Sequence, residues 1–148
     1  MDMKRWLDTL LSELQTEYLK SAGYRKQGRT FSRSRSGYTE RFNVQGSSWN
    51  GTGVKWRFYL NVGIEFNDVP PELYWSYFSH THWAARAEAL VTDAPSDWNY
   101  DSNTDRVALK ALLAQTIFAA SRTLEARSAD LRAEYLNKHY ASRKSVGT

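Results

Sequence analysis

VKWRFYLNVGIEF, residues 54–66, is the stretch that decides the fold. Its apolar residues occupy every second position, with lysine, arginine, tyrosine, asparagine, glycine and glutamate between them. Successive side chains of a strand point to opposite faces, so this rhythm predicts a strand with one buried and one solvated face. Such a clean alternation is typical of antiparallel sheets, and we expect residues 54–66 to be the central strand.

Three weaker patterns predict its neighbours. The basic, polar stretch 24–35 leads through Ser36-Gly37 into a second alternating segment, 38–45, and together they predict a hairpin. Residues 81–91 alternate as well and predict a fourth strand, although the alanines there favour helix. Residues 72–78 fit a short helix or a loop.

A helix is predicted at each end of the chain. Apolar residues recur at three- and four-residue steps from about residue 3 to 22, and Gly23 follows as a C-cap. A second helical pattern starts at Asp105, capped by Asn103 or Thr104, and continues as one long helix or as two that break near Ser128. We expect the tail 141–148 to be frayed.

These elements predict one α+β domain spanning residues 1–148. It consists of a single antiparallel four-stranded, or slightly larger, sheet with the N-terminal and C-terminal helices packed on one face. A chain of this length hides enough surface for one core.

Composition narrows the function classes. The absence of cysteine excludes disulfides, thiolate nucleophiles and cysteine-ligated metals. We expect a cytoplasmic protein without membrane contact, because no run approaches the ~20 apolar residues that cross a bilayer and the N-terminus lacks a signal-peptide stretch. We also expect no cofactor. Residues 1–50, 51–105 and 106–148 carry charges of +4, −5 and +5, which predicts a polarised surface.

Several short motifs occur in an order that resembles a known family. They are Ala22-Gly23-Tyr24, Gly28-Arg29-Thr30-Phe31, Phe42-Asn43-Val44-Gln45, Ser48-Trp49-Asn50, residues 58–64, Trp83 to Arg86, and Trp98. The set resembles the uncharacterised bacterial domain-of-unknown-function family 4304. Such domains are also similar to small proteins encoded beside bacterial toxins, so the resemblance implies an immunity or other interaction role. It implies no catalytic residues.

Catalytic and metal chemistry find little support. His80 and His82 would share one face of a strand, but a third metal ligand would have to come from His139, Glu72 or Asp93 without a local motif, so we expect no metal site. No nucleophile elbow, framed carboxylate pair or phosphate-binding glycine fingerprint occurs. An enzyme without a recognisable motif stays the second alternative.

The first alternative is a basic nucleic-acid-binding domain. Its phosphate contacts would come from the basic hairpin, namely Arg25, Lys26, Arg29, Arg33, Arg35 and Arg41. The same charges also protect edge strands from aggregation.

We favour a non-enzymatic protein-interaction domain, in its most concrete form an inhibitor that occludes a partner protein such as a toxin. The polar side of residues 54–66 and an aromatic cluster beside two prolines would supply the contacts, because Tyr, Trp and Arg are favoured interface anchors. The candidate partner-binding residues are Trp49, Lys55, Arg57, Tyr59, Asn61, Tyr74 and Trp75. Oligomeric state cannot be read from the sequence.

Overall fold

The computed structural model describes residues 2–47, 50, 55–74, 76 and 78–146, with side chains as far as His139. Helical and extended elements follow one another in this order: α1 (Met3–Leu14), the π-helical turn η1 (Gln15–Leu19), η2 (Lys20–Ala22), β1 (Arg25–Gln27), β2 (Thr30–Ser34), β3 (Tyr38–Gly46), β4 (Trp56–Phe66), η3 (Pro71–Leu73), β5 (Trp83–Arg86), η4 (Ala87–Ala89), β6 (Trp98–Tyr100) and α2 (Arg106–Val146).

All strands belong to one antiparallel sheet with the order β1-β2-β3-β4-β5. β6 pairs with residues 56–58 of β4, and β5 pairs with residues 61–64. The predicted central strand is therefore confirmed, since β4 pairs with three others. In the described part of the chain the sheet has six strands, at the larger end of the prediction.

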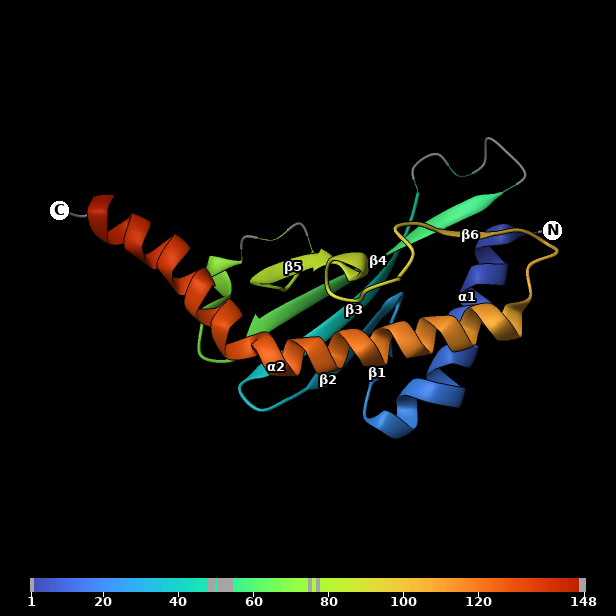
Figure 1. Ribbon diagram of the computed structural model, residues 1–148, viewed down its shortest axis with the longest axis horizontal. Helices are drawn as coiled ribbons and strands as arrows, with labels where there is room; N and C mark the ends of the chain where they lie inside the picture. The colour runs from blue at the N-terminus through green and yellow to red at the C-terminus, as the bar shows by residue number, and fades with distance from the viewer. Residues whose placement is uncertain (1, 48–49, 51–54, 75, 77, 147–148) are drawn as a thin grey trace.

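The inner face of the sheet is the one that carries the core. Phe42 of β3 and Val62 of β4 are register partners on this face and are fully buried. The buried side chains of α1 and α2 pack against it. Figure 1 shows that α2 runs along the sheet and that α1 lies near the N-terminal end of α2. The predicted α+β architecture with helices at both ends of the chain is confirmed.

The outer face of the sheet carries the remaining, alternate side chains of β4. Arg57, Tyr59, Asn61, Gly63 and Glu65 of β4 lie on this face. Asn61 and Gly63 are nevertheless buried, because chain from beyond β4 lies over this part of the sheet. The face that was predicted to be solvated is therefore partly covered by another segment of the chain.

Two strand predictions need correction. The basic stretch 24–35 forms two short strands that turn at Gly28, whose φ of +60° is readily adopted only by glycine. The predicted strand 81–91 is shorter, from Trp83 to Arg86, and Ala87 and Ala89 belong to η4, where Ala87 is fully buried. The Leu90 carbonyl then accepts a hydrogen bond from Thr123 of α2 at 3.4 Å, which draws this segment toward the helix.

The first helical segment ends where predicted, whereas α2 has a different N-cap. Gly23 closes the first helical segment at φ +97°, as predicted. The cap of α2 is Asp105, whose carboxylate accepts a hydrogen bond from the Ala108 amide at 3.1 Å, and not Asn103 or Thr104. α2 is one helix that continues past Ser128 and bends along its length (Figure 1). The chain from residue 141, which we expected to fray, is still helical as far as Val146.

By length and composition, residues 106–139 of α2 could span a membrane. Its apolar stripe, however, lies in the core: Leu113, Ile117 and Leu124 are fully buried against the sheet and α1. A helix of this kind is typical of the core of a small globular domain.

Candidate functional site

The outer face is hollowed by a polar groove of about 690 Å3. Its floor is formed by Arg41, Asn43 and Gln45 of β3 and Asn61 of β4. The three β3 residues are two apart in sequence, and Asn43 is the register partner of Asn61. The pleat therefore points all four side chains to the same face.

Two segments that are distant in sequence form the walls. One wall belongs to the hairpin of β1 and β2 and the other to the segment between η3 and β5; the lining residues are Gln27, Thr30 and Ser32 on the first, and Phe78, Ser79 and His80 on the second. The groove thus exists only after the chain beyond β4 has folded back over the sheet.

Gly63 allows this second wall to approach the sheet. A Cβ atom at Gly63 would lie 2.6 Å from the ring of Phe78 and 2.6 Å from the methyl group of Thr81. A glycine inside a strand often marks the close approach of another segment. Only a residue without a side chain leaves room for the wall at this position.

Asn61 is the most buried polar residue of the floor, with 3% of its surface exposed. Its amide nitrogen donates to Gln45 Oε1 at 3.0 Å and to Asn43 Oδ1 at 3.3 Å. Its own Oδ1 is buried and accepts no hydrogen bond from a described residue. Buried polar atoms normally have a partner, so this oxygen is a vacant acceptor.

Within the part of the lining that the structure describes, Arg41 is the one permanently charged residue, and its charge is compensated. Its guanidinium donates to Glu65 at 2.5 Å, to Ser32 at 2.9 Å and to the His80 carbonyl at 3.4 Å. Tyr74 donates its hydroxyl to the other oxygen of Glu65. Burial, followed by this bond to Glu65, raises the pKa of Tyr74 to about 12. Hydrogen bonds from Tyr74 and Arg41 lower the pKa of Glu65, although burial alone would raise it.

The two histidines do not share a face, which corrects the sequence expectation. His80 is exposed at the rim of the groove, in a turn with φ +63°. His82 is buried, accepts the Phe66 amide on Nδ1 at 2.9 Å, and its Nε2 lies 3.2 Å from the Pro70 carbonyl. Within the described chain, no three His, Asp or Glu residues are grouped as metal ligands.

The predicted partner-binding residues are distributed unevenly. Lys55 and Arg57 are exposed, and Tyr59 is half-buried with the Arg86 guanidinium 4.3 Å from its ring centroid. Asn61, expected on the exposed side, is buried in the groove floor. Tyr74 is half-buried against the His82 ring and bonded to Glu65. Trp49 and Trp75 lie outside the described residues.

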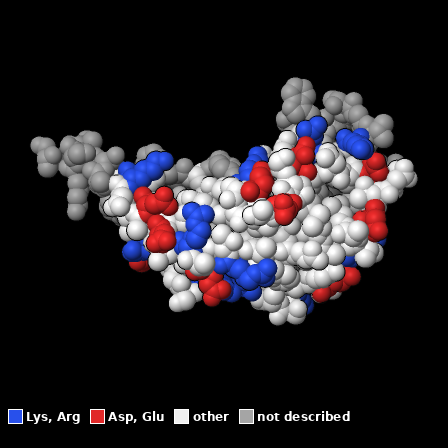
Figure 2. Space-filling model, in the orientation of Figure 1, with Lys and Arg blue, Asp and Glu red and all other residues white. Residues whose placement is uncertain are grey.

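The basic hairpin does not form one cationic surface. Four of the six residues pair with carboxylates: Arg29 with Asp8, Arg33 with Glu40, Arg35 with Glu125, and Arg41 with Glu65. Arg33 and Arg41 also lie on opposite faces of the sheet, because their register partners are Glu40 and Ser32. Figure 2 shows blue and red residues interspersed on the side along which α2 runs, with no continuous basic field in this view.

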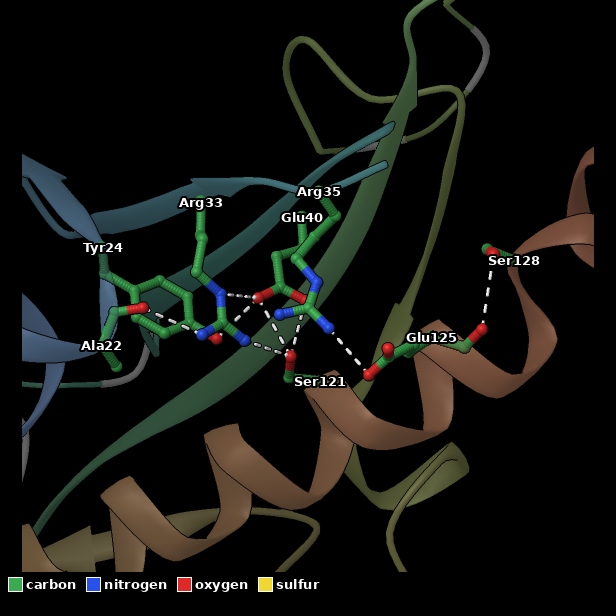
Figure 3. Close-up of polar contacts among 8 residues, drawn as sticks. All are labelled: Ala22, Tyr24, Arg33, Arg35, Glu40, Ser121, Glu125 and Ser128. Carbon is green, nitrogen blue, oxygen red and sulfur yellow. Dashed lines mark hydrogen bonds and ion pairs between the residues drawn. The ribbon is translucent and has the colours of Figure 1, made fainter. Parts of the chain in front are cut away.

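A second polar cluster lies on the inner face around Glu40, which is fully buried (Figure 3). Its carboxylate accepts hydrogen bonds from Tyr24 at 2.6 Å, Arg33 at 2.8 Å and Ser121 at 2.8 Å. Arg33 also donates to the Ala22 carbonyl at 2.9 Å and stacks over the Tyr24 ring at 4.4 Å. Every charge here has its partner, so the cluster joins the end of the first helix, the sheet and α2.

The Glu40 cluster is structural in its chemistry. Burial, followed by the negative charge of Glu40, raises the pKa of Tyr24 far above its ordinary value, so its hydroxyl stays a proton donor to the carboxylate. A carboxylate saturated by fixed donors is a poor general base. We therefore place the candidate functional site in the outer groove.

A wider hollow of about 960 Å3 lies between α1 and the start of α2. Charges of both signs line it, and the central ones are paired: Lys110 contacts Glu13 at 3.1 Å and Glu17 at 2.6 Å, and Arg106 contacts Glu13 at 3.2 Å. These ion pairs fasten α2 to the first helical segment. The hollow is thus a seam between two helices.

The fold and groove together define a small α+β domain whose sheet is covered by helices on one face and carries a polar depression on the other. Residues 15–125 match the family described as a domain of unknown function (DUF4304), and the chain belongs to that family. No curated protein and no solved structure matches the chain.

Proposed function

We propose that this domain is a non-enzymatic binding module that docks a protein partner on the outer face of its sheet. In its most concrete form it is an immunity-type inhibitor that occludes a bacterial toxin. The observation that carries the proposal is the asymmetry of the sheet. Helices bury the inner face, whereas the outer face keeps an unfilled polar groove flanked by half-exposed Arg57 and Tyr59.

Tyr59 supports this reading because its ring is already held in place. The Arg86 guanidinium stacks 4.3 Å from the ring centroid, and the two residues come from adjacent strands. A rigid aromatic side chain loses little conformational freedom on binding, which is what an anchor residue needs. Arg57, 48% exposed and paired with Asp97 at 3.4 Å, lies two residues away on the same face.

The test uses the purified domain and the proteins encoded by adjacent genes, with affinities measured by titration calorimetry. Tyr59→Ala and Arg57→Ala are expected to weaken binding by tenfold or more, as is typical of anchor residues. Arg106→Ala is the matched control for Arg57, because Arg106 is a similarly exposed arginine, 42% against 48%, in an ion pair with Glu13 on the helical side of the molecule. Binding that falls with Arg106→Ala but not with the two sheet variants would contradict the proposed surface.

Salt dependence and two hairpin variants distinguish protein docking from the nucleic-acid alternative. Phosphate-driven binding falls steeply as salt rises, and it would respond to Arg25→Ala and Lys26→Ala, the two hairpin residues that form no ion pair with a described residue. An anchor-driven protein contact responds to Tyr59 and depends little on salt.

A further inference from the structure

The groove has the charge balance of a site for an uncharged ligand. Among the described residues that line it, only Arg41 carries a permanent charge, and Glu65 neutralises it at 2.5 Å. An anionic ligand would have to compete with Glu65 for this guanidinium. The next cation, Arg25, is the register partner of Ser32 but is exposed at the rim, where water screens its charge.

The hydrogen bonds among the lining residues leave several donors unused. Thr30 accepts from Asn43 at 3.0 Å and Ser32 accepts from Arg41 at 2.9 Å, so each hydroxyl keeps its own proton for another acceptor. Gln45 uses its oxygen to accept from Asn61, and its NH2 group donates to no described residue. The hairpin wall and the floor therefore offer donors at three separate positions.

The floor also offers one acceptor. Asn61 Oδ1 is buried without a donor in the described chain, and the other end of the same amide is fixed by Asn43 and Gln45. In this arrangement the two bonds use both protons of Nδ2, which leaves Oδ1 as the acceptor that the amide offers to the groove. A ligand group that enters this floor must donate as well as accept hydrogen bonds.

From this arrangement we infer that the groove binds a small, neutral, polyhydroxylated molecule of the sugar class. Each sugar hydroxyl accepts and donates one hydrogen bond, which suits a lining of unused donors around one vacant acceptor. Among the described lining residues, Phe78 supplies an apolar aromatic surface against which the apolar face of a sugar ring can lie. The volume of about 690 Å3 lies within the usual range of small-molecule sites. This inference goes beyond the proposed protein docking and is independent of it.

The test is a titration followed by NMR of the side-chain amides of Asn43, Gln45 and Asn61. The probes are glucose, maltose and sucrose, together with glucuronate and glucosamine as charged counterparts of glucose. We expect saturable shifts of these amide signals with at least one neutral sugar, and binding of the charged counterparts that is about tenfold weaker or absent. Asn43→Ala should weaken the binding of that sugar about tenfold, because it removes the group that positions both Thr30 and Asn61.

Asn99→Ala is the matched control, since Asn99 is an exposed asparagine on the outer face of the sheet that does not line the groove. It should leave the affinity unchanged. The inference is overturned if no neutral sugar shifts the floor amides, if only a charged counterpart binds, or if Asn43→Ala and Asn99→Ala have equal effects. Since the probes are small molecules and the domain is used alone, these results neither support nor remove protein docking at Tyr59.

Discussion

The hydroxyl of Ser121 lies 3.0 and 2.8 Å from the two carboxylate oxygens of Glu40, although the residues are 81 positions apart in sequence. Glu40 is the third residue of β3, and Ser121 lies in the N-terminal half of α2. Their contact is the point at which the long C-terminal helix is fixed to the sheet by a polar bond in the core.

Ser121→Ala should destabilise the domain. The substitution removes one donor from a fully buried carboxylate, and an unsatisfied buried group costs about 1–3 kcal/mol. Urea unfolding with an unchanged slope would measure the loss of free energy. The control is Ser128→Ala, about two turns further along α2. Among the described residues its hydroxyl bonds to the Glu125 carbonyl at 3.5 Å, so the substitution should change stability by less than about 0.5 kcal/mol. Equal effects of the two variants would show that the Glu40 contact contributes nothing.

Glu40→Gln should cost more than Ser121→Ala. It leaves the Arg33 guanidinium, whose side chain is 18% exposed, without its carboxylate, and breaking a buried pair on one side costs about 3–5 kcal/mol. Glu125→Gln is the matched control, because Glu125 also pairs with a hairpin arginine but is 65% exposed, and such surface pairs contribute about 0–1 kcal/mol.

The double variant Arg33→Met with Glu40→Leu completes this test. Replacing both members of a buried pair by apolar residues removes the uncompensated charge, so the double variant should be more stable than Glu40→Gln. If the stability losses of the single variants Arg33→Met and Glu40→Leu simply add up to that of the double variant, Arg33 and Glu40 are not coupled and the account of the cluster is wrong.

The sequence predicted the sheet because its signals are local. The alternation of residues 54–66 and of 38–45 needs only neighbouring residues to be recognised, and it puts Glu40 on the same side of its strand as Phe42. The partners of Glu40 could not be predicted, because Tyr24, Arg33 and Ser121 approach it from three different elements. For the same reason, Arg33 looked like a free cation of a basic hairpin.

The groove was predicted only in part. The polar side of β4 was chosen as a docking surface, but Asn61 was expected to be exposed, since nothing in the strand itself shows that Phe78 lies over its neighbour Gly63. The available signal was Gly63, a glycine inside an otherwise strong strand pattern, which indicates close approach of another segment. His80 and His82 were placed on one face because they are two apart, and the turn at His80 removes that periodicity.

Gly63→Ala tests the packing that forms the groove wall. The new methyl group would stand 2.6 Å from the Phe78 ring and from the Thr81 methyl, so the wall has to move outward, and overpacking of this kind costs about 1–3 kcal/mol. Gly46→Ala is the control, because its nearest neighbour atom, Arg29 Nη1, is 3.5 Å away in ordinary contact. Thermal unfolding of both variants measures the difference, and Phe78→Ala in the Gly63→Ala background should recover part of the loss. A neutral Gly63→Ala variant would mean that the wall is not held against the sheet.

Glu65 should make stability depend on pH in the acid range. Its pKa in the folded domain lies below the ordinary value of 4.5, because the hydrogen bonds from Tyr74 and Arg41 outweigh burial. As pH falls, the unfolded chain therefore takes up this proton first, and the folded state loses its advantage. The contribution of Glu65 is fully present above about pH 5 and disappears as pH falls through the lower folded pKa.

The measurement compares the unfolding free energy of the parent chain with that of Glu65→Gln. The difference between them should be largest near neutral pH and should shrink steadily below about pH 4.5, since glutamine cannot titrate. Glu72→Gln serves as the control, because Glu72 is exposed and pairs with no described residue, so its effect on stability should be close to zero. A Glu65→Gln deficit that stays constant from neutral to acid pH would show that the carboxylate gains nothing from Arg41 and Tyr74. It would also show that Glu65 does not neutralise Arg41, as the proposed charge balance of the groove requires.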